Sequence, residues 1–420
     1  MPQGLVIADL GNNPNSLPFI STFGNPSAAT DAFGRLRVSN PVTIFDSKQL
    51  VDKQPLFWDD QLVSGSGGAS TYNTNQSSTT LSVASSTAAV RVRQTFRRFN
   101  YQPGKSQLIL LTGIFDTGGT GIIKRIGQFD ANNGLFFEQN GTTLNVVRRT
   151  KTSGTVVDNP IAQSSWNIDK LDGTGESGIT LDVTKTQIFV IDYQWLGVGT
   201  VRFGFEIDGK LYYVHQINNA NNLNLVYMST PNLPLRVEII NDGTGAANSL
   251  THICASVVTE GGLQETGFSL ATDRGATPLV TLNDTSFYPL VALRLKSTYL
   301  GVNIDIKKAS IVVSSSTLYH WVLLLNPTVV GTALSFTGIT NSALEAGVGT
   351  TNATTVTGGT VLDSGYELSQ NESELMAIFP NKLAIGSNIA NTSDILVLAV
   401  QRITGTTESF YAGLTWNETI

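Results

Sequence analysis

The lack of a helical hydrophobic repeat constrains this chain more than any other feature of its sequence. No segment of useful length has apolar residues at the spacings of three, four and seven that mark one face of a helix. They lie instead in short alternating segments, which glycine, asparagine, aspartate and proline separate. Because alternation places every second side chain on the same face of a strand, the pattern predicts an all-β protein of antiparallel strands.

Two hairpins give the clearest fold signal. Residues 135–149 form an apolar pair of segments around Asn140-Gly141, a dipeptide that suits a type I′ turn. Residues 200–217 repeat the arrangement around Asp208-Gly209. A nearly continuous apolar run at 107–116 is typical of a strand that is buried on both faces. Together with further short strands, these hairpins predict an antiparallel β-sandwich of two sheets.

The hairpin region also carries a resemblance. GQFDANNGLFFEQNGTTLNVVRRT, followed by DYQWLGVGTVRFGFEIDGKLYYVHQI, resembles concanavalin-like jelly-roll modules over well under half of the chain. The length of 420 residues allows about two to three domains. We therefore expect a jelly-roll sandwich at 66–265, and a second, C-terminal β domain at 266–420 after a junction rich in threonine, glycine and proline.

Residues 1–65 have a different character. Prolines recur at positions 18, 26, 41 and 55, and proline interrupts the hydrogen-bond ladder of a sheet. Each buried aromatic side chain contributes about 2–3 kcal/mol, so the aromatic residues of this stretch need a surface to cover them. We predict an extended N-terminal docking arm that lies either on its own body or on a neighbouring subunit.

Residues 89–99 (AVRVRQTFRRF) contain an arginine ladder. The alternation predicts that Val90, Val92 and Phe96 face inward, while Arg91, Arg93 and Arg97 point outward. Outward arginines could bind phosphate or acidic sugars. Pairing with carboxylates of a neighbouring strand or subunit is the more common arrangement, and we expect it here.

Composition excludes several classes of function. The chain has 26 basic and 32 acidic residues, a net charge of −6, which argues against nucleic-acid binding. No segment approaches the ~20 apolar residues that cross a bilayer, and the opening residues have no secretory signal pattern. The single cysteine and three histidines leave little material for a metal site. We expect no cofactor, no metal, no membrane insertion and synthesis in a host cytoplasm.

Acidic residues at turns are the remaining chemical candidates. A polysaccharide-degrading enzyme would need two carboxylates in one groove, for which the candidates are Asp116, Asp130, Glu138, Glu206 and Asp208. Residues 130–134 and 169–176 place oxygen ligands at the short intervals that calcium prefers, without the closing bidentate glutamate. Because carboxylates at turns usually cap the backbone, we expect neither catalytic residues nor calcium.

A second resemblance concerns the two ends of the chain. DAFGRLRVSNPVTIFDS at 31–47 is similar to a segment near the N-terminus of structural proteins from tailed bacteriophages, many of them marine. The passages at 294–306 and 412–418 have the same character. The resemblance implies a virion component. Capsid decoration, head fibre and tail-associated protein all stay open.

From these observations we expect a non-enzymatic virion structural protein that forms a homo-oligomer, with a trimer favoured, and contacts capsid or tail proteins. The expected docking contacts are Phe33, Arg35, Arg37 and Phe45. The alternative is a host-glycan receptor-binding protein of a tail or fibre, in which Trp166 and Trp195 would stack on a sugar.

Overall fold

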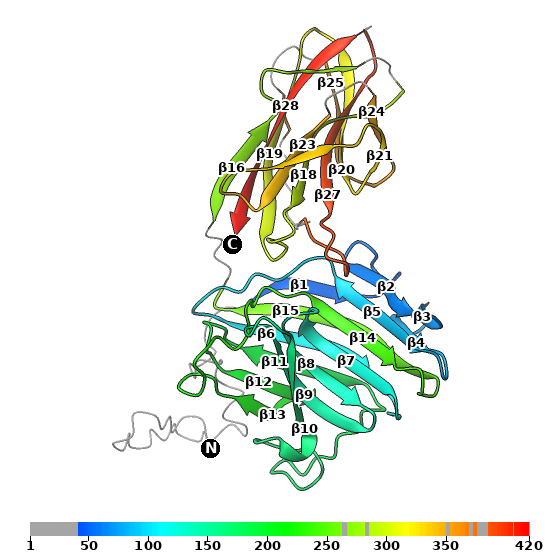
Figure 1. Ribbon diagram of the computed structural model, residues 1–420, viewed down its shortest axis with the longest axis vertical. Coiled ribbons are helices and arrows are strands. Elements are labelled where there is room, and N and C mark those ends of the chain that lie inside the picture. The colour runs from blue at the N-terminus through cyan, green and yellow to red at the C-terminus, as the bar shows by residue number, and fades with distance from the viewer. Residues whose placement is uncertain are drawn as a thin grey trace, which may run out of the picture. The chain divides into compact units, whose positions relative to one another are not determined.

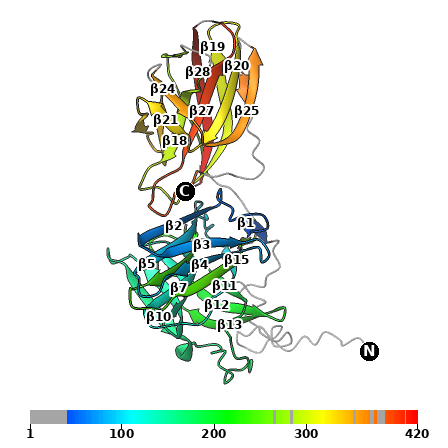
Figure 2. The same cartoon turned by 90° about the vertical axis from the view of Figure 1, so that its right-hand side faces the viewer.

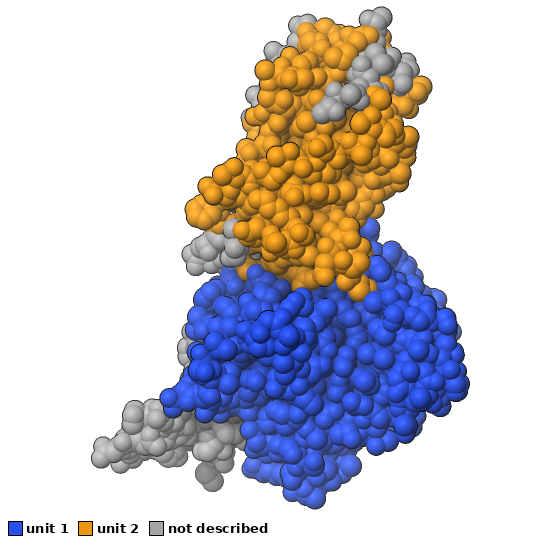
Figure 3. Space-filling view, viewed as in Figure 1, with its two compact units in different colours: residues 1–95, 101–264 blue, residues 96–100, 265–420 orange. Residues whose placement is uncertain are grey.

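The computed structural model describes residues 41–262, 267–281, 285–349, 353–368, 373–375, 385–405 and 407–419. The chain divides into two compact units, one of residues 1–95 and 101–264, the other of 96–100 and 265–420 (Figure 3). Within the described ranges the regular structure is β-sheet, apart from one 3-10 turn at Gln163–Ser165. None of these residues forms a helix with the length and apolar character that a membrane span requires. The all-β fold class is confirmed.

The first unit is an antiparallel sandwich of two sheets (Figure 1). The eight-stranded sheet runs β13 (Lys210–Ile217), β12 (Val201–Ile207), β11 (Gln187–Tyr193), β6 (Ser106–Ile114), β15 (Asn248–Glu260), β4 (Ser78–Val83) and β3 (Gly68–Asn73), and β1 (Val42–Lys48) also pairs with β15. The seven-stranded sheet runs β10 (Val157–Ala162), β9 (Thr143–Thr150), β8 (Gly134–Asn140), β7 (Ile122–Phe129), β14 (Leu235–Asn241), β5 (Ala89–Thr95) and β2 (Trp58–Gly65). This is the predicted jelly-roll sandwich.

Both predicted hairpins form, but only the second has the predicted type I′ turn. Asn140 of β8 pairs with Thr143 of β9, so the central residues of the first turn are Gly141 and Thr142, and of these only Gly141 has a positive φ, 60°. Ile207 of β12 pairs with Lys210 of β13, so Asp208 and Gly209 are the central residues of the second turn, with φ of 54° and 72°. Positive φ at both central residues is what a type I′ turn requires, and its twist matches that of the paired strands.

An aromatic cluster fills the space between the two sheets. Phe137 of β8 lies 5.2 Å from Phe189 of β11 and 5.0 Å from Phe205 of β12, measured between ring centroids. All three side chains are fully buried. These contacts join β8 of one sheet to β11 and β12 of the other, so they hold the sandwich together.

Residues 42–65 of the predicted arm are part of this sandwich. β1 pairs with β15 of one sheet, and β2 pairs with β5 of the other. Phe45 is only 9% exposed and contacts the rings of Phe57 and Trp58, so it belongs to the core and is no docking contact. Of the two expected surfaces for the arm, this stretch therefore covers its own body, and it does so as strands of the sandwich. Its other proposed contacts, Phe33, Arg35 and Arg37, lie outside the described residues.

The arginine ladder pairs with a carboxylate of a neighbouring strand, as predicted, because Arg91 and Arg93 of β5 both lie beside Asp60 of β2. Its inward and outward faces differ from the prediction. Arg93 is fully buried between the sheets, where its guanidinium lies 4.9 Å from the Trp58 ring and 3.6 Å from the Asp60 carboxylate. Burial lowers the pKa of Arg93 to about 10. Val92, on the opposite face of β5, is fully buried too. When both faces of a strand are covered, alternation in the sequence no longer tells which face is inward.

The second unit contains the predicted C-terminal β domain (Figure 2). Its five-stranded sheet runs β16 (Phe268–Asp273), β28 (Glu408–Thr419), β19 (Asn303–Val313) and β26 (Ser373–Leu375), and β17 (Leu279–Thr281) also pairs with β28. Its six-stranded sheet runs β22 (Ser335–Gly338), β23 (Leu344–Val348), β18 (Tyr288–Leu295), β27 (Ile395–Arg402), β20 (Leu318–Leu325) and β25 (Thr360–Leu368). β21 (Thr328–Gly331) and β24 (Thr354–Thr357) form a separate pair.

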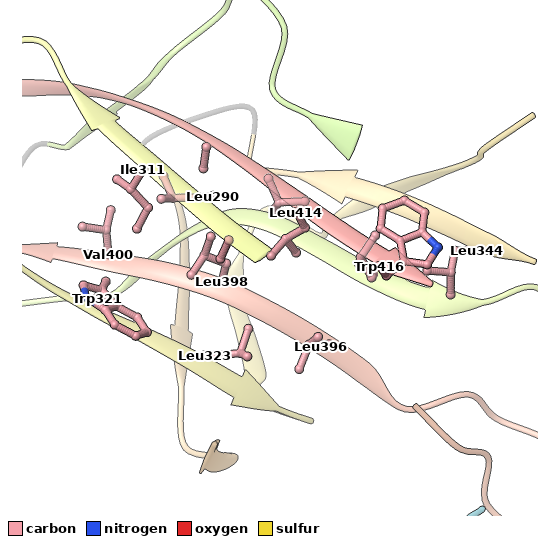
Figure 4. Packing of buried hydrophobic residues seen from close by; sticks show 14 of the residues in the cluster. Leu290, Ile311, Trp321, Leu323, Leu344, Leu396, Leu398, Val400, Leu414 and Trp416 are labelled. Atoms are coloured by element: carbon pink, nitrogen blue, oxygen red, sulfur yellow. The ribbon is translucent and has the colours of Figure 1, made fainter. Parts of the chain in front are cut away.

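Large apolar side chains from both sheets form the core of this unit. Leu398 of β27, Leu290 of β18 and Leu414 of β28 converge in it, and Trp416 of β28 closes one end (Figure 4). The unit begins at residue 265, one residue before the predicted boundary, and takes in 96–100, which the prediction had placed in the jelly roll. There the Ser387 N–H donates to the Phe96 carbonyl at 3.0 Å.

Replacement of Trp58 tests whether β2 is part of the sandwich. Trp58 is 2% exposed, its ring lies 4.7 Å from that of His252, and its Nε1 donates to Ser47 Oγ at 2.9 Å. Trp58→Ala should lower the free energy of unfolding of the first unit by about 3–5 kcal/mol, because the cavity adds to the lost burial. Phe57→Ala, at a ring that is 41% exposed, should lower it by about 1 kcal/mol or less. If chemical denaturation showed that both variants lose the same unfolding free energy, the place of β2 in the sandwich would be contradicted.

Candidate binding site

A cleft of about 670 Å³, lined by both apolar and polar side chains, lies on the eight-stranded sheet of the first unit. Strands β6, β11 and β12 form its floor, and the segment that precedes β11 forms a wall. The polar side chains that line it include Thr112, Asp182, Lys185, Thr186, Glu206 and Asp208. Its volume is within the range of about 300–1,000 Å³ that is usual for small-ligand sites.

Strand register explains why these residues meet. Ile188 of β11 pairs with Thr112 of β6 on one side and with Glu206 of β12 on the other. The next residues in register, among them Phe189 and Phe205, are buried in the core. Since successive side chains of a strand point to opposite faces, Thr112 and Glu206 lie on the outer face of the sheet.

Local hydrogen bonds hold the wall of the cleft in place. Asp182 Oδ1 accepts from the backbone N–H of Thr184 at 3.0 Å and from its hydroxyl at 2.6 Å. Gln187 Nε2 donates to the Asp182 carbonyl at 2.7 Å. The Asp116 N–H donates to the Val183 carbonyl at 3.0 Å, which ties the wall to the end of β6. The cleft is therefore formed before any ligand arrives.

The charges of the cleft are mostly available to a ligand. The Glu206 and Asp208 carboxylates and the Thr112 and Thr186 hydroxyls have no hydrogen bond or ion pair with any part of the chain that the structure describes. Lys185 Nζ lies 3.4 Å from Asp182 Oδ2 in an exposed pair. Three carboxylates against one ammonium make the cleft acidic. It can accept hydrogen bonds from hydroxyl or amine groups and repels anions.

Asp182 remains charged at neutral pH. The hydroxyl of Thr184 and then its backbone N–H donate to the carboxylate, and these bonds hold the pKa of Asp182 below its ordinary value. Its exposure to solvent limits what such bonds contribute to stability. Their effect on the cleft is electrostatic, because they keep an ionised carboxylate on this wall.

The outer face of the seven-stranded sheet is also charged, but its charges are already paired. Register places Glu138 of β8, Arg125 of β7 and Glu238 of β14 in one row. Arg125 Nε donates to Glu138 Oε2 and its Nη1 to Glu238 Oε1, both at 2.8 Å. Arg236 Nε also donates to Glu238, at 2.9 Å. Burial would raise the pKa of Glu238, but Arg236 and Arg125 outweigh it and lower the pKa.

Arginines also cover the aromatic rings of this face. The guanidinium of Arg149 lies 5.2 Å from the Phe136 ring, and that of Arg236 lies 5.5 Å from the Phe129 ring. Both rings are fully buried. They offer no surface on which a sugar could stack, and the charged groups above them form ion pairs with one another. This face is a self-contained network that stabilises the sheet.

The two predicted sugar-stacking tryptophans are not part of the cleft. Trp166 is 3% exposed, its Nε1 donates to the Ile161 carbonyl at 3.2 Å, and its ring packs near Phe205. Because no ring face is open, Trp166 is a core residue, which corrects the prediction. Trp195 is half-buried and its Nε1 donates to the Met228 carbonyl at 3.1 Å. It follows the far end of β11 from the cleft, and its role in stacking stays a prediction.

The carboxylates proposed for calcium cap turns. Asp130 Oδ1 accepts from the N–H groups of Asn132 and Asn133 at 2.7 and 2.9 Å. The two oxygens of Asp169 accept from Leu171 at 2.9 Å and Ser177 at 2.8 Å. Among the residues that the structure describes, no cluster of three or more histidine, cysteine, aspartate or glutamate side chains is arranged to hold a metal.

Sequence reasoning found part of the cleft. Glu206 and Asp208 were singled out as carboxylates at a hairpin turn, whereas Thr112, Lys185 and Thr186 were missed. No signal in the sequence marks those three, because the pairing of β6 with β11 and the fold of the wall bring them to one place.

No family model and no curated protein matches this sequence. Among solved structures, the chain is similar to a β-glucanase of Bacillus licheniformis, with 11% identity and a TM-score of 0.33 over 51% of this chain and 96% of that one. It is also similar to a legume lectin-like domain from Entamoeba histolytica, with 10% identity and a TM-score of 0.31 over 53% of this chain and 99% of that one. A third is the CBM2 module of the evolved Dit of Lactobacillus casei BL23 phage J-1, with 6% identity and a TM-score of 0.34 over 53% and 98%. Similarity at this level says nothing about function.

Replacement of Arg125 tests the paired network. In Arg125→Met the buried Glu138 carboxylate loses its guanidinium partner, so the first unit should lose about 3 kcal/mol of stability near neutral pH. Lys48→Met, at an exposed pair, should change it by about 0.5 kcal/mol or less. Urea unfolding of the two variants and the wild type at neutral pH provides the comparison.

The network also predicts a pH dependence. The pKa of Glu238 is lowered in the folded state, so its stabilisation is present above the ordinary carboxyl pKa of about 4.3 and is lost as pH falls through the lower folded value. The deficit of Arg125→Met should shrink over the same acidic range, because protonation neutralises the unpaired carboxylate. A deficit that stays constant with pH would show that the loss comes from packing alone.

Proposed function

We propose that this protein is a non-catalytic component of a virus particle that binds a neutral saccharide in the cleft on the eight-stranded sheet. One observation carries the saccharide assignment: the cleft holds carboxylates and hydroxyls that have no partner among the described residues. Sugars carry many hydroxyl donors, and carboxylates accept from them with charge-assisted hydrogen bonds. The excess of negative charge disfavours acidic sugars and favours neutral ones.

Binding is favoured over hydrolysis by the state of the other carboxylates. A glycosidase needs one carboxylic acid that stays protonated, so the surroundings of that carboxyl group must raise its pKa. Glu138 and Glu238 both pair with Arg125, Glu238 pairs with Arg236 as well, and the pKa of Glu238 is lowered.

The place on a virus particle is supported by the phage-like segment at 31–47 and by the low share of charged residues, 14%. A weakly charged surface suits a protein whose faces are largely occupied by neighbouring subunits. We propose capsid or tail proteins as its partners, with Phe33, Arg35 and Arg37 in the contact, and a homo-oligomer as its form. A low-resolution map of the assembled particle tests this: the chain should appear on the head or the tail, and its absence from the particle would refute the proposal.

Binding at the cleft can be tested with the purified full chain. We expect neutral oligosaccharides on a glycan array to bind and acidic ones to give no signal above background. For the best neutral oligosaccharide, the double variant Glu206→Gln, Asp208→Asn should weaken the Kd about tenfold or more, because a hydrogen bond to a charged group contributes about 1.5–3 kcal/mol. Asparagine tolerates the φ of 54° at position 208, so the turn should be kept.

Asp46→Asn is the matched control, because it removes an exposed carboxylate from β1 of the same sheet. It should leave the Kd unchanged. No neutral sugar above background, or equal affinity of the double variant, would contradict the cleft assignment. Shortening of the oligosaccharide on incubation would contradict the non-catalytic part of the proposal.

A further inference from the structure

A lysine is buried beside the turn that supports the wall of the cleft. Lys124 of β7 is fully buried and pairs with Gln139 of β8, two residues from the core ring of Phe137, so it lies on the inner face of its sheet. Its Nζ donates to the Phe115 carbonyl and, at 2.9 Å, to the Thr117 carbonyl. Among the described residues, no carboxylate lies within ion-pair distance of this Nζ. The partners of the ammonium are therefore backbone carbonyls of the connection between β6 and β7.

Residues 115–117 form a turn whose three carbonyls all accept from side chains. Besides the lysine, Gln139 Nε2 donates to the Asp116 carbonyl at 3.2 Å, and Asn248 Nδ2 donates to the Thr117 carbonyl at 3.2 Å. Asp116 has a φ of 63°, a left-handed backbone that is uncommon for residues other than glycine. Such a conformation persists only where the surrounding structure holds it. The lysine holds the carbonyls on both sides of this residue.

The same turn is bonded to the wall of the cleft. The Asp116 N–H donates to the Val183 carbonyl at 3.0 Å, and Val183 lies between the cleft residues Asp182 and Lys185. This N–H and the Phe115 carbonyl belong to one peptide group. Because a trans peptide group is planar, its C=O and N–H point in opposite directions. The lysine that binds the carbonyl therefore also fixes the direction in which the N–H meets the wall.

We propose that Lys124 is a positioning residue for the saccharide cleft, because its ammonium holds the peptide group between Phe115 and Asp116 and thereby keeps the wall at Val183 in its binding arrangement. The inference rests on the proposed function of the cleft.

The chemistry of the buried ammonium supports this role. Burial lowers the pKa of Lys124 to about 8, so the group is still mostly protonated at neutral pH and has three N–H donors. A buried ammonium without an ion-pair partner costs stability, and an apolar side chain would suit a position that only filled the core. The turn that the ammonium holds accounts for a lysine at this position.

Hydrogen exchange of the full chain at neutral pH, followed by mass spectrometry, tests the hold on the wall. In Lys124→Met two buried carbonyls lose their charged donor, so peptides covering 115–121 and 179–187 should exchange about tenfold faster or more. Peptides covering the β8–β9 hairpin at 135–149 should exchange as in the wild type.

Gln128→Met is the matched control. Gln128 lies on the same face of β7, nearer its other end, is 1% exposed, and donates from Nε2 to the Leu233 carbonyl at 3.2 Å. This variant also removes a buried donor to a carbonyl, but one that is not bonded to the turn. It should leave the exchange of 115–121 and 179–187 unchanged. Thermal unfolding of both variants establishes that they are folded.

Affinity tests the consequence for binding. For the neutral oligosaccharide with the strongest signal on the glycan array, Lys124→Met should weaken the Kd about fivefold or more, because a wall that keeps its binding arrangement for only a fraction of the time lowers the apparent affinity by that fraction. Direct contact with the sugar is excluded by the burial of Lys124. Gln128→Met should leave the Kd unchanged.

Three results would each overturn the proposal: wild-type exchange at 179–187 in Lys124→Met, acceleration that is uniform across the first unit, or an unchanged Kd. A wild type that binds no neutral sugar would instead refute the saccharide assignment. The exchange experiment needs no sugar, so it would still decide whether Lys124 holds the wall.

Discussion

The packing of two sheets on one aromatic core decides where every other side chain of the first unit lies. Phe137, Phe189 and Phe205 meet between the sheets, so their neighbours along each strand must point to the outer face of their sheet. On β12 this places Glu206 on the outer face, one residue from the core ring of Phe205. On β8 it does the same for Glu138, next to Phe137. Both charged surfaces of the sandwich are therefore consequences of a single buried contact.

The charged groups of the two outer faces differ in their pairing. Those of the seven-stranded sheet stabilise the fold, and those of the eight-stranded sheet can bind a ligand. Arg125 lies between Glu138 and Glu238, so on the seven-stranded sheet each charge already has a partner and a ligand would have to displace it. On the eight-stranded sheet, Glu206 and Asp208 have no such partner among the described residues, and a ligand hydroxyl replaces only water. Binding in the cleft therefore costs less free energy than binding at the paired face, where existing ion pairs would have to be broken.

What the sequence could predict was local. The hairpins at Gly141 and at Asp208-Gly209 depend on positive φ angles that those residues favour, and both form, although the first turn lies one residue later than predicted. The place of β1 depends on its pairing with β15, some two hundred residues away, which no local pattern encodes, and the prolines nearby argued against a strand. The cleft shows the same limit: the hairpin that carries its two carboxylates was predicted, while Lys185 reaches it only through the fold of the wall.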